Sequence, residues 1–327
     1  MGHRKKYLWA IIFVFLSGAY CAAGENNAAE AFVRETGAEE GPPAESSAAE
    51  GVKDAVIEDF SNKFSLGLAL RYNGMYFLQE NEPDENISSD LPLDFGLIAA
   101  FEWLTLTFNL SLINTFNSEF LKAKSFDAQI DLYRETMYWK FFAKNYQGFH
   151  LYSINDGDKG GEIGLEMFSG GLYWLYISDY RQHSLRAAYS LDRKQNRSSG
   201  SFLIGANTIY NSIYSGDGSI SRYADRQHLL SLGPNGGYSY TWIFDNNMFI
   251  NIHAIVGLNL SLNINARNWF FTPQILPKAA LGYHGKTWSI NVVGESEILI
   301  WRQDETIRDN TVWFSVSVTL MKRFFTT

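Results

Sequence analysis

The chain of 327 residues has one cysteine, a minority of basic residues and no long apolar run beyond its N-terminal leader. A single thiol cannot build a disulfide framework. A membrane-spanning helix needs about 18 or more consecutive apolar residues, and no later segment offers them. With 27 basic against 35 acidic residues, the formal net charge is −8, so a polyanion such as nucleic acid is a poor partner.

The N-terminus has the order of a secretory signal peptide. Basic residues at 3–6 precede an apolar segment at 7–16, and small residues follow up to Ala23. We expect cleavage after Ala23, which removes residues 1–23. This takes away Cys21 and three basic residues, so the net charge falls from −8 to −11. Acylation of Cys21 is an alternative, disfavoured because Tyr20 stands where a lipid-attachment signal has a small residue.

Residues 24–60 differ in composition from everything that follows. Between Glu25 and Asp59 there are ten acidic residues and two basic ones, and Ala, Gly, Ser and Pro fill much of the rest. A segment with so few large apolar groups cannot offset the entropy lost on ordering. We predict an acidic, disordered periplasmic linker; an acidic docking arm is the alternative.

The longest regular pattern runs from Met248 to Ile264. Even-numbered residues are apolar, and most odd-numbered ones are polar or small. A period of two means a β-strand, whose successive side chains point to opposite faces. Soluble strands average about five or six residues, whereas a strand of this length can cross an apolar layer about 25 Å tall when tilted. We expect Val256 and Leu258 to face lipid, and Gly257 and Asn259 to face a polar lumen.

Similar alternation recurs from Phe60 to the C-terminus. We predict strands at residues 63–75, 93–101, 103–113, 125–134, 136–143, 163–177, 183–191, 200–212, 229–244, 248–264, 273–284, 286–300 and 310–324. This pattern predicts an all-β protein, a transmembrane antiparallel up-and-down β-barrel of about 12–14 strands in residues 61–327. A soluble β-sandwich is the main rival. Glycines at 170–171, and Pro234 with glycines at 236–237, predict bends or bulges.

The predicted connections have two lengths. Tight turns fall near residues 102, 135, 245–247 and 285–286, and long polar loops at 79–92, 114–124, 144–162, 265–272 and 301–309. Short periplasmic turns alternating with longer external loops are typical of such barrels. The alternation breaks at 212–228, and an odd number of strands would put the termini on opposite sides. Either a strand near 213–228 makes fourteen, or one predicted strand is wrong and the count is twelve.

Aromatic residues gather beside the predicted turns and loops. They are Phe101, Trp103, Trp242, Phe244, Trp269, Phe270, Phe271, Tyr283, Trp288 and Trp301. Amphipathic rings prefer the headgroup level of a membrane, so these residues predict aromatic girdles.

Three stretches are similar to a known family. They are residues 184–189 (SLRAAY), 197–205 (RSSGSFLIG) and 232–240 (LGPNGGYSY), and residues 147–151 (QGFHL) resemble a further step of the same family. The chain resembles domain of unknown function 4421, an uncharacterised family of secreted bacterial β-proteins, from about Leu93 to Phe324. The resemblance implies an outer-membrane barrel and lends no catalytic residue, because the family has no assigned activity.

Charged residues collect on the predicted lumen face. By strand parity these are Arg71, Asp127, Asp131, Arg186, His253, Lys278, Glu295 and Glu297. Unpaired charges away from water are costly, so we expect a network of ion pairs that fills the lumen. The alternative is a charged substrate path or constriction.

We predict no catalytic, cofactor or metal site. A membrane-embedded lipid-modifying enzyme needs a nucleophile and a base within hydrogen-bond reach, and no His-x-Ser places them on one strand face. The histidines at 150, 183, 228, 253 and 284 lack metal-ligand spacing.

The expected location is the outer membrane of a Gram-negative-type bacterium, with outer-membrane lipid as a partner. Residues 324–327 (FFTT) resemble an aromatic-ended signal for the barrel-assembly machinery, but two threonines follow the phenylalanines. We expect a narrow pore or carrier for small solutes of unknown identity. The alternative is a structural or surface-exposed barrel without transport, because 12–14 strands lie between filled and open barrels.

Overall fold

The computed structural model describes residues 55–60, 64–79, 85–89, 93–111, 124–153, 159–220, 223–302 and 308–324. The predicted signal peptide and most of the predicted linker lie outside these residues. The strands are β1 (Ile57–Asp59), β2 (Phe64–Gln79), β3 (Glu85–Ser89), β4 (Leu93–Phe101), β5 (Leu104–Ser111), β6 (Lys124–Arg134), β7 (Met137–Ser153), β8 (Lys159–Ile177), β9 (Arg193–Gln195), β10 (Ser199–Ser215), β11 (Gln227–Ile243), β12 (Met248–Asn263), β13 (Asn268–His284), β14 (Trp288–Arg302) and β15 (Arg308–Phe324), and one helix, α2 (Leu185–Tyr189), lies between β8 and β9.

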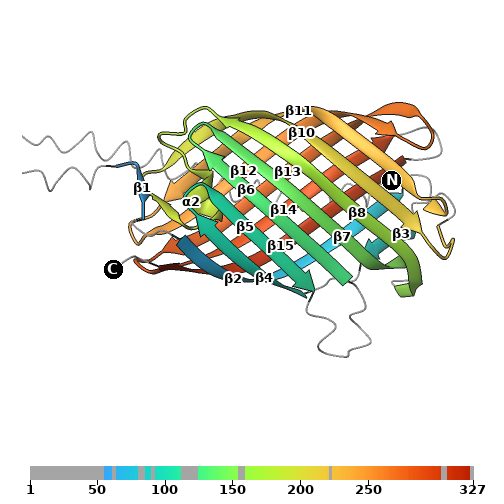
Figure 1. Ribbon diagram of the computed structural model, residues 1–327, viewed down its shortest axis with the longest axis horizontal. Coiled ribbons are helices and arrows are strands. Elements are labelled where there is room, and N and C mark those ends of the chain that lie inside the picture. Colours follow the sequence, from blue (N-terminus) through green and yellow to red (C-terminus); the bar gives the residue numbers. More distant parts are fainter. Residues whose placement is uncertain are drawn as a thin grey trace, which may run out of the picture. The chain divides into compact units, whose positions relative to one another are not determined.

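Twelve antiparallel strands form a closed wall, which confirms the predicted transmembrane β-barrel (Figure 1). The wall runs through β2, β4, β5, β6, β7, β8 and β10 to β15, and β15 pairs with β2 from Phe324↔Phe64 onward to close it. The predicted strand at 183–191 is wrong, because helix α2 and its flanking turns occupy those residues. Without it the predicted count is twelve, and no further strand lies among the described residues between β10 and β11.

Side chains alternate between the two faces of the wall as predicted. On β12, Val256 and Leu258 are 61% and 51% exposed on the outside, whereas Asn259 on the inside is 0% exposed. Exposed leucines and valines on the other strands extend this outer apolar band, which suits lipid. Among the described residues, no helix is long and apolar enough to cross a membrane.

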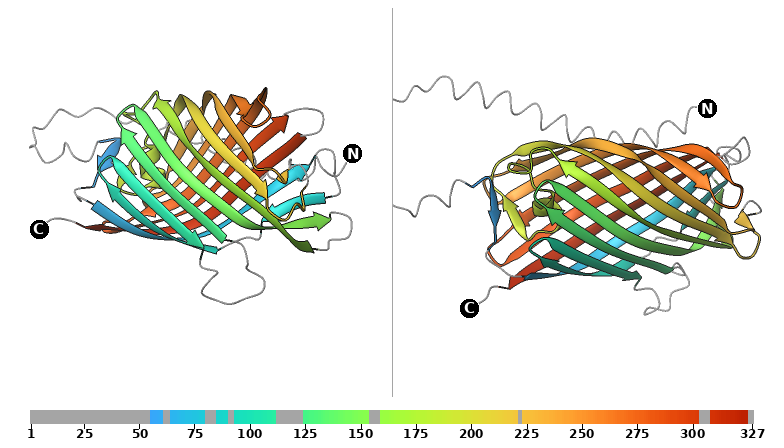
Figure 2. Two further views of the ribbon diagram at one scale, coloured as in Figure 1. Left: turned by 45° about the vertical axis from the view of Figure 1, so that its right-hand side comes forward. Right: turned by 45° about the horizontal axis from the view of Figure 1, so that its top comes forward.

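The barrel has two distinct ends. Short turns lie at one end, together with the start of β2 and the end of β15, and we call it the turn end. The opposite end, where β2 ends at Gln79 and β15 begins at Arg308, is the loop end, and Figure 2 shows the two ends of the wall. Several strands extend further into the predicted loops than expected, since β7 reaches Ser153 and β8 begins at Lys159.

Near the loop end, one strand takes the place of three in the wall. Strand β3 pairs with residues 76–78 of β2 and with residues 85–89 opposite 149–153 of β7, whereas β4, β5 and β6 stop lower down. The diameter of a barrel falls with its number of strands, so the wall narrows here. The register of β7 shifts beside Gly148, whose φ of 84° suits a glycine bulge, at the point where its partner changes from β6 to β3.

The sites predicted for bends or bulges at the other glycines and at Pro234 show no register shift, so they are not bulges. Strand β8 pairs without a shift through Gly170 and Gly171, and β11 keeps one register with β12 on both sides of Pro234. A Cβ at residue 171 would lie 2.5 Å from the carbonyl oxygen of Thr208, so glycine there permits a close approach of the strands.

Buried polar groups such as Asn211, Ser231 and Ser261 line part of the loop-end half of the lumen, as predicted, but much of this half is apolar. One cluster of buried side chains crosses it: Met75, Phe77, Ile87, Tyr146, Phe149, Ile163, Leu165, Met167, Ile213, Ile220, Tyr223, Leu229, Phe270, Leu299, Trp301 and Trp313. We call this set the apolar cluster. Phe270 and Trp301, predicted for the aromatic girdle, belong to it and point inward, whereas Trp269 and Phe271 remain on the lipid face.

The turn end is covered by residues 178–198, which we call the cap. It contains α2 and β9, and β9 pairs with β1 (Figure 1). Residues 57–59, at the end of the predicted disordered linker, are therefore an ordered strand. Buried Leu185, Ala188 and Leu191 of the cap pack against inward side chains of the wall.

Candidate functional site in the barrel lumen

Four of the predicted lumen residues form one chain of ion pairs. Arg71 on β2 pairs with Asp127 on β6, and its other guanidinium nitrogen lies 2.9 Å from Oε1 of Glu295 on β14. The second oxygen of Glu295 accepts from Nζ of Lys278 on β13 at 3.0 Å. Strand alternation brings all four inward, so the chain crosses the lumen between opposite walls. We call these four residues the ion chain.

Glu297 stands beside the ion chain in a separate hydrogen-bond group. Its Oε1 accepts from the Tyr173 hydroxyl at 2.7 Å and from Nε2 of Gln274 at 2.8 Å. Gln274 also accepts from Asn207 at 2.9 Å. This carboxylate is therefore held by neutral donors, with no ion pair among the described residues.

Asp131 and His253 lie on the turn-end side of the lumen. Asp131 accepts from the Tyr138 hydroxyl at 2.6 Å and from Gln129 at 2.5 Å. The His253 ring packs edge-on against Tyr189 of α2, with centroids 5.8 Å apart. Two cavities, of about 70 and 90 Å³, have Tyr138, His253, Lys278 and Glu295 in common among their lining residues. Each has room for a few water molecules.

The sequence reasoning missed two lysines and an indole at this site. Lys140 and Lys144 on β7 stand opposite Asp131 and Asp127 in the register with β6. Lys144 is buried, and its Nζ lies 3.4 Å from the ring centroid of Trp313. Lys144 was placed in a loop because the predicted strand ended at residue 143, whereas β7 continues to Ser153. A continued count of alternate positions from Tyr138 would have found it.

Arg186 is the one predicted lumen residue that is not on the wall. It belongs to α2, where its guanidinium holds Asp192 through Nε at 2.8 Å and Nη2 at 2.5 Å. Burial raises the pKa of Asp192, and the Arg186 charge opposes that shift. The pair therefore fastens the two ends of the helical turn and takes no part in the ion chain.

Further polar contacts hold the cap against the wall. The Tyr189 hydroxyl donates to Asn251 at 2.5 Å, Asn291 donates to the Ala188 carbonyl at 2.9 Å, and Arg323 donates to the Leu191 carbonyl at 2.9 Å. These partners lie on β12, β14 and β15, so the cap is tied to several strands.

His183 contacts a serine that the sequence did not connect with it. Its Nε2 lies 2.9 Å from Oγ of Ser239, and its Nδ1 lies 3.2 Å from the Ser199 carbonyl. Burial lowers the pKa of His183 to about 4, so the ring is neutral at pH 7. Ser239 is 0% exposed, so no substrate reaches this pair as it stands and its role is to anchor the cap.

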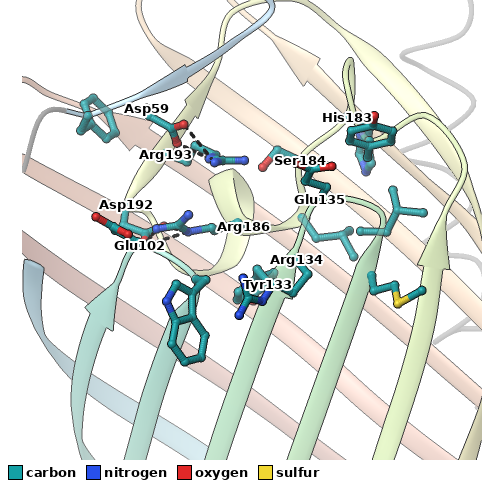
Figure 3. Close-up of a pocket in the computed structure, with 16 residues that line it drawn as sticks. Asp59, Glu102, Tyr133, Arg134, Glu135, His183, Ser184, Arg186, Asp192 and Arg193 are labelled. Carbon is teal, nitrogen blue, oxygen red and sulfur yellow. Dashed lines mark hydrogen bonds and ion pairs between the residues drawn. The ribbon is translucent and has the colours of Figure 1, made fainter. Parts of the chain in front are cut away.

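A larger cavity of about 540 Å³ opens at the turn end, beside the cap (Figure 3). Its lining includes both members of the ion pairs Arg186–Asp192 and Arg193–Asp59. Glu102, Arg134 and Glu135 line it from two short turns of the wall. We call this space the turn-end cavity.

The lumen chemistry is that of a stabilising network. Each member of the ion chain has a charged partner, which offsets the cost of burial. Among the described residues, no group of three or more His, Cys, Asp or Glu side chains is placed to hold a metal ion.

A family model, described as domain of unknown function DUF4421, matches residues 54–324. No curated protein matches the chain. Among solved structures, the beta domain of the Bordetella autotransporter BrkA aligns at 11% identity and a TM-score of 0.42, covering 80% of this chain and 100% of that one. The P. putida toluene transporter TodX aligns at 7% identity and 0.29, covering 82% and 91%. The outer-membrane protease OmpT from Escherichia coli aligns at 6% and 0.26, covering 81% and 97%.

Proposed function

The chain belongs to the DUF4421 family, and on that premise we propose that it is an outer-membrane structural barrel whose lumen does not conduct solutes. The observation that carries this proposal is the apolar cluster, which spans the loop-end half of the lumen from β2 to β14. A solute would have to displace a packed protein core to pass. This favours the alternative of a barrel without transport over a narrow pore.

The proposed location in the outer membrane rests on the apolar outer surface of the barrel and on the turns and loops that join its strands. The apolar band needs lipid around it, and barrels of this kind place short turns in the periplasm and long loops outside. The turn end, with the cap, then faces the periplasm. Membrane fractionation tests this: we expect the mature protein in the outer-membrane fraction, migrating faster unheated than boiled. Recovery as a soluble periplasmic monomer would contradict it.

A gated carrier is the second candidate, because the cap resembles a removable plug. It rests on polar contacts, and the cavities of about 70 and 90 Å³ lie beneath it. In a carrier, displacement of the cap would open the lumen. In a closed barrel it would not, since the apolar cluster remains at the loop end.

Planar-bilayer conductance with two proteins separates these candidates. One is the full-length protein, and the other has residues 179–197 replaced by a short Asn-Gly turn. We expect neither to conduct, with both showing β-rich circular dichroism and heat-modifiable migration. Stable conductance steps from the cap-deleted protein alone would support the carrier. Conductance from the full-length protein would overturn the closed barrel.

A further inference from the structure

The turn-end cavity is lined by no residue of the ion chain or of the apolar cluster. Its volume of about 540 Å³ falls in the range of small-molecule sites, about 300–1,000 Å³. Its walls come mainly from the β4–β5 turn, the β6–β7 turn, the cap, and Asp59 and Phe60 at the end of β1. Four separate parts of the chain therefore build one concave surface, which Figure 3 shows with side chains directed toward a common space.

Much of the polar lining is already satisfied by the protein itself. The Arg186 and Asp192 side chains form a bidentate pair, and Arg193 pairs with Asp59. Both ring nitrogens of His183 have partners. These groups shape the cavity and leave little charge free for a ligand.

Three charged residues of the lining have no ion pair in the described part of the chain. They are Glu102, Arg134 and Glu135, all exposed and all on the two wall turns. The Arg134 guanidinium lies over the Trp103 ring, with Cζ 5.0 Å from the centroid. Stacking on a ring uses the face of the guanidinium and leaves its edge donors free to bind a carboxylate bidentately.

The rest of the exposed lining is aromatic or apolar. It includes Trp103, Tyr133, Met137 and Tyr180. The cavity thus combines two free carboxylates, one oriented guanidinium and a non-polar wall. A simple anion is disfavoured by the two carboxylates, and a bare cation by the guanidinium.

We propose that the turn-end cavity binds a short peptide that carries at least one ammonium group and a free carboxylate. The ammonium group pairs with Glu102 or Glu135, the carboxylate with Arg134, and the peptide's carbon chain lies against the rings. In the orientation given above, this site is open to the periplasm. The inference is independent of conductance, because the site lies outside the closed half of the lumen.

The test is isothermal titration of the full-length, detergent-refolded protein with the dipeptide lysyl-alanine. There are three further probes. One is lysyl-alanine with both amino groups acetylated, the second is its C-terminal amide, and the third is inorganic phosphate. We expect saturable binding of the unmodified dipeptide, at least about tenfold weaker binding of either blocked form, since a charge-assisted contact is lost, and no binding of phosphate. Equal binding of all four probes, or no saturable binding of lysyl-alanine up to millimolar concentration, would overturn the proposal.

Variants locate the site. Arg134→Gln, and the double change Glu102→Gln with Glu135→Gln, alter exposed turn residues and should each weaken binding about tenfold. The matched controls are Asp245→Asn and Lys286→Gln, which alter exposed residues on other turns at the same end and should leave binding unchanged. Thermal unfolding of each variant checks that the barrel is intact. If the controls weaken binding as much as the cavity variants do, the dipeptide binds to general surface charge and the proposed site is wrong.

Discussion

Inside one continuous wall, the largest apolar cluster fills the lumen toward the loop end, whereas the ion chain and the cap fill it toward the turn end, where smaller apolar clusters also lie. Toward the loop end, aromatic and aliphatic side chains interdigitate, as in Phe77 against Phe149 with centroids 5.7 Å apart. Toward the turn end, the ion chain and the cap leave cavities of about 70 and 90 Å³ between polar groups. The same strands supply both halves. Alternation therefore determines which residues point inward, but not what kind of interior they make.

The largest expected effect is in the apolar half. Phe77→Ala removes a ring that is 0% exposed and contacts Phe149 and Tyr223, so the free energy of unfolding should fall by about 3–5 kcal/mol. Denaturant titration in lipid vesicles measures it. Phe202→Ala, on the lipid face, leaves no internal cavity and should cost clearly less. Equal losses would show that the loop-end half is not packed as a core.

In the polar half, a loss of similar size should be repairable. Arg71→Leu leaves Asp127 buried without its partner, which costs about 3–5 kcal/mol. Adding Asp127→Asn removes the uncompensated charge, while Glu295 keeps its pair with Lys278. We expect the double variant to recover part of the free energy of unfolding in the same titration. A double variant less stable than Arg71→Leu alone would contradict the ion-chain description.

The next largest loss of stability should come from a charge placed on the lipid face of β12. The comparison of the two halves of the lumen depends on a correct assignment of the two faces of this strand. Val256→Arg puts a charge on the lipid face, at a cost of about 2–4 kcal/mol near the membrane midplane. Asn259→Arg, toward the lumen, would cost much less only if the packing there were loose. Asn259 is fully buried, and its Oδ1 would lie 2.5 Å from a Cβ at residue 233, so the packing is tight and we expect a cost of similar size.

Spin labels at 256 and 259 check the same faces without relying on stability. A lipid-soluble quencher should reach a label at 256 and spare one at 259. Equal quenching at both positions would mean that the faces are assigned wrongly.

Most of the wall could be predicted from period-two alternation, because lipid outside and a distinct interior impose it on every strand. The strand at 183–191 was mispredicted because Leu185, Ala187 and Tyr189 also alternate with polar or small neighbours. The local signals of a helix were present: the Ser184 hydroxyl caps the helix by accepting from the Ala187 amide at 3.2 Å. The odd number of strands was the other sign of this error.

The filling of the lumen was harder to predict. Strand β3 has a mostly polar sequence, and it pairs with residues distant in the chain, so no local pattern indicates it. The apolar cluster requires knowing which strands meet across the lumen. A signal existed in β8, where Ile163, Leu165 and Met167 are apolar on the face that points inward.

Acid should loosen the cap before it affects the wall. The pKa of His183 is lowered to about 4 in the folded protein, against about 6.5 unfolded, so the folded state requires the neutral ring. Its stabilising effect is complete above about pH 6.5 and is lost as pH falls toward 4, by up to about 3 kcal/mol. Hydrogen exchange of α2 at pH 7 and pH 4.5 measures this. His183→Gln, which does not titrate, should reduce the difference between the two pH values.

The smallest effect should come from the contact between the linker and the cap. Asp59 and Arg193 form an ion pair, but their side chains are 65% and 31% exposed, so Asp59→Asn should cost at most about 1 kcal/mol. Strand β1 keeps its other contacts, since Asn196 donates from its backbone to the Val56 carbonyl at 2.8 Å, and Cζ of Arg323 lies 3.4 Å from the centroid of the Phe60 ring. We therefore expect limited proteolysis near residues 55–60 to quicken by less than about fivefold, with global unfolding unchanged.

Phe60→Ala removes the ring that packs against Arg323 and should quicken cleavage more than Asp59→Asn does. Rapid hydrogen exchange in α2 of Asp59→Asn alone would contradict this expectation. It would mean that the exposed ion pair, and not the packing of Phe60 against Arg323, holds the cap on the turn end.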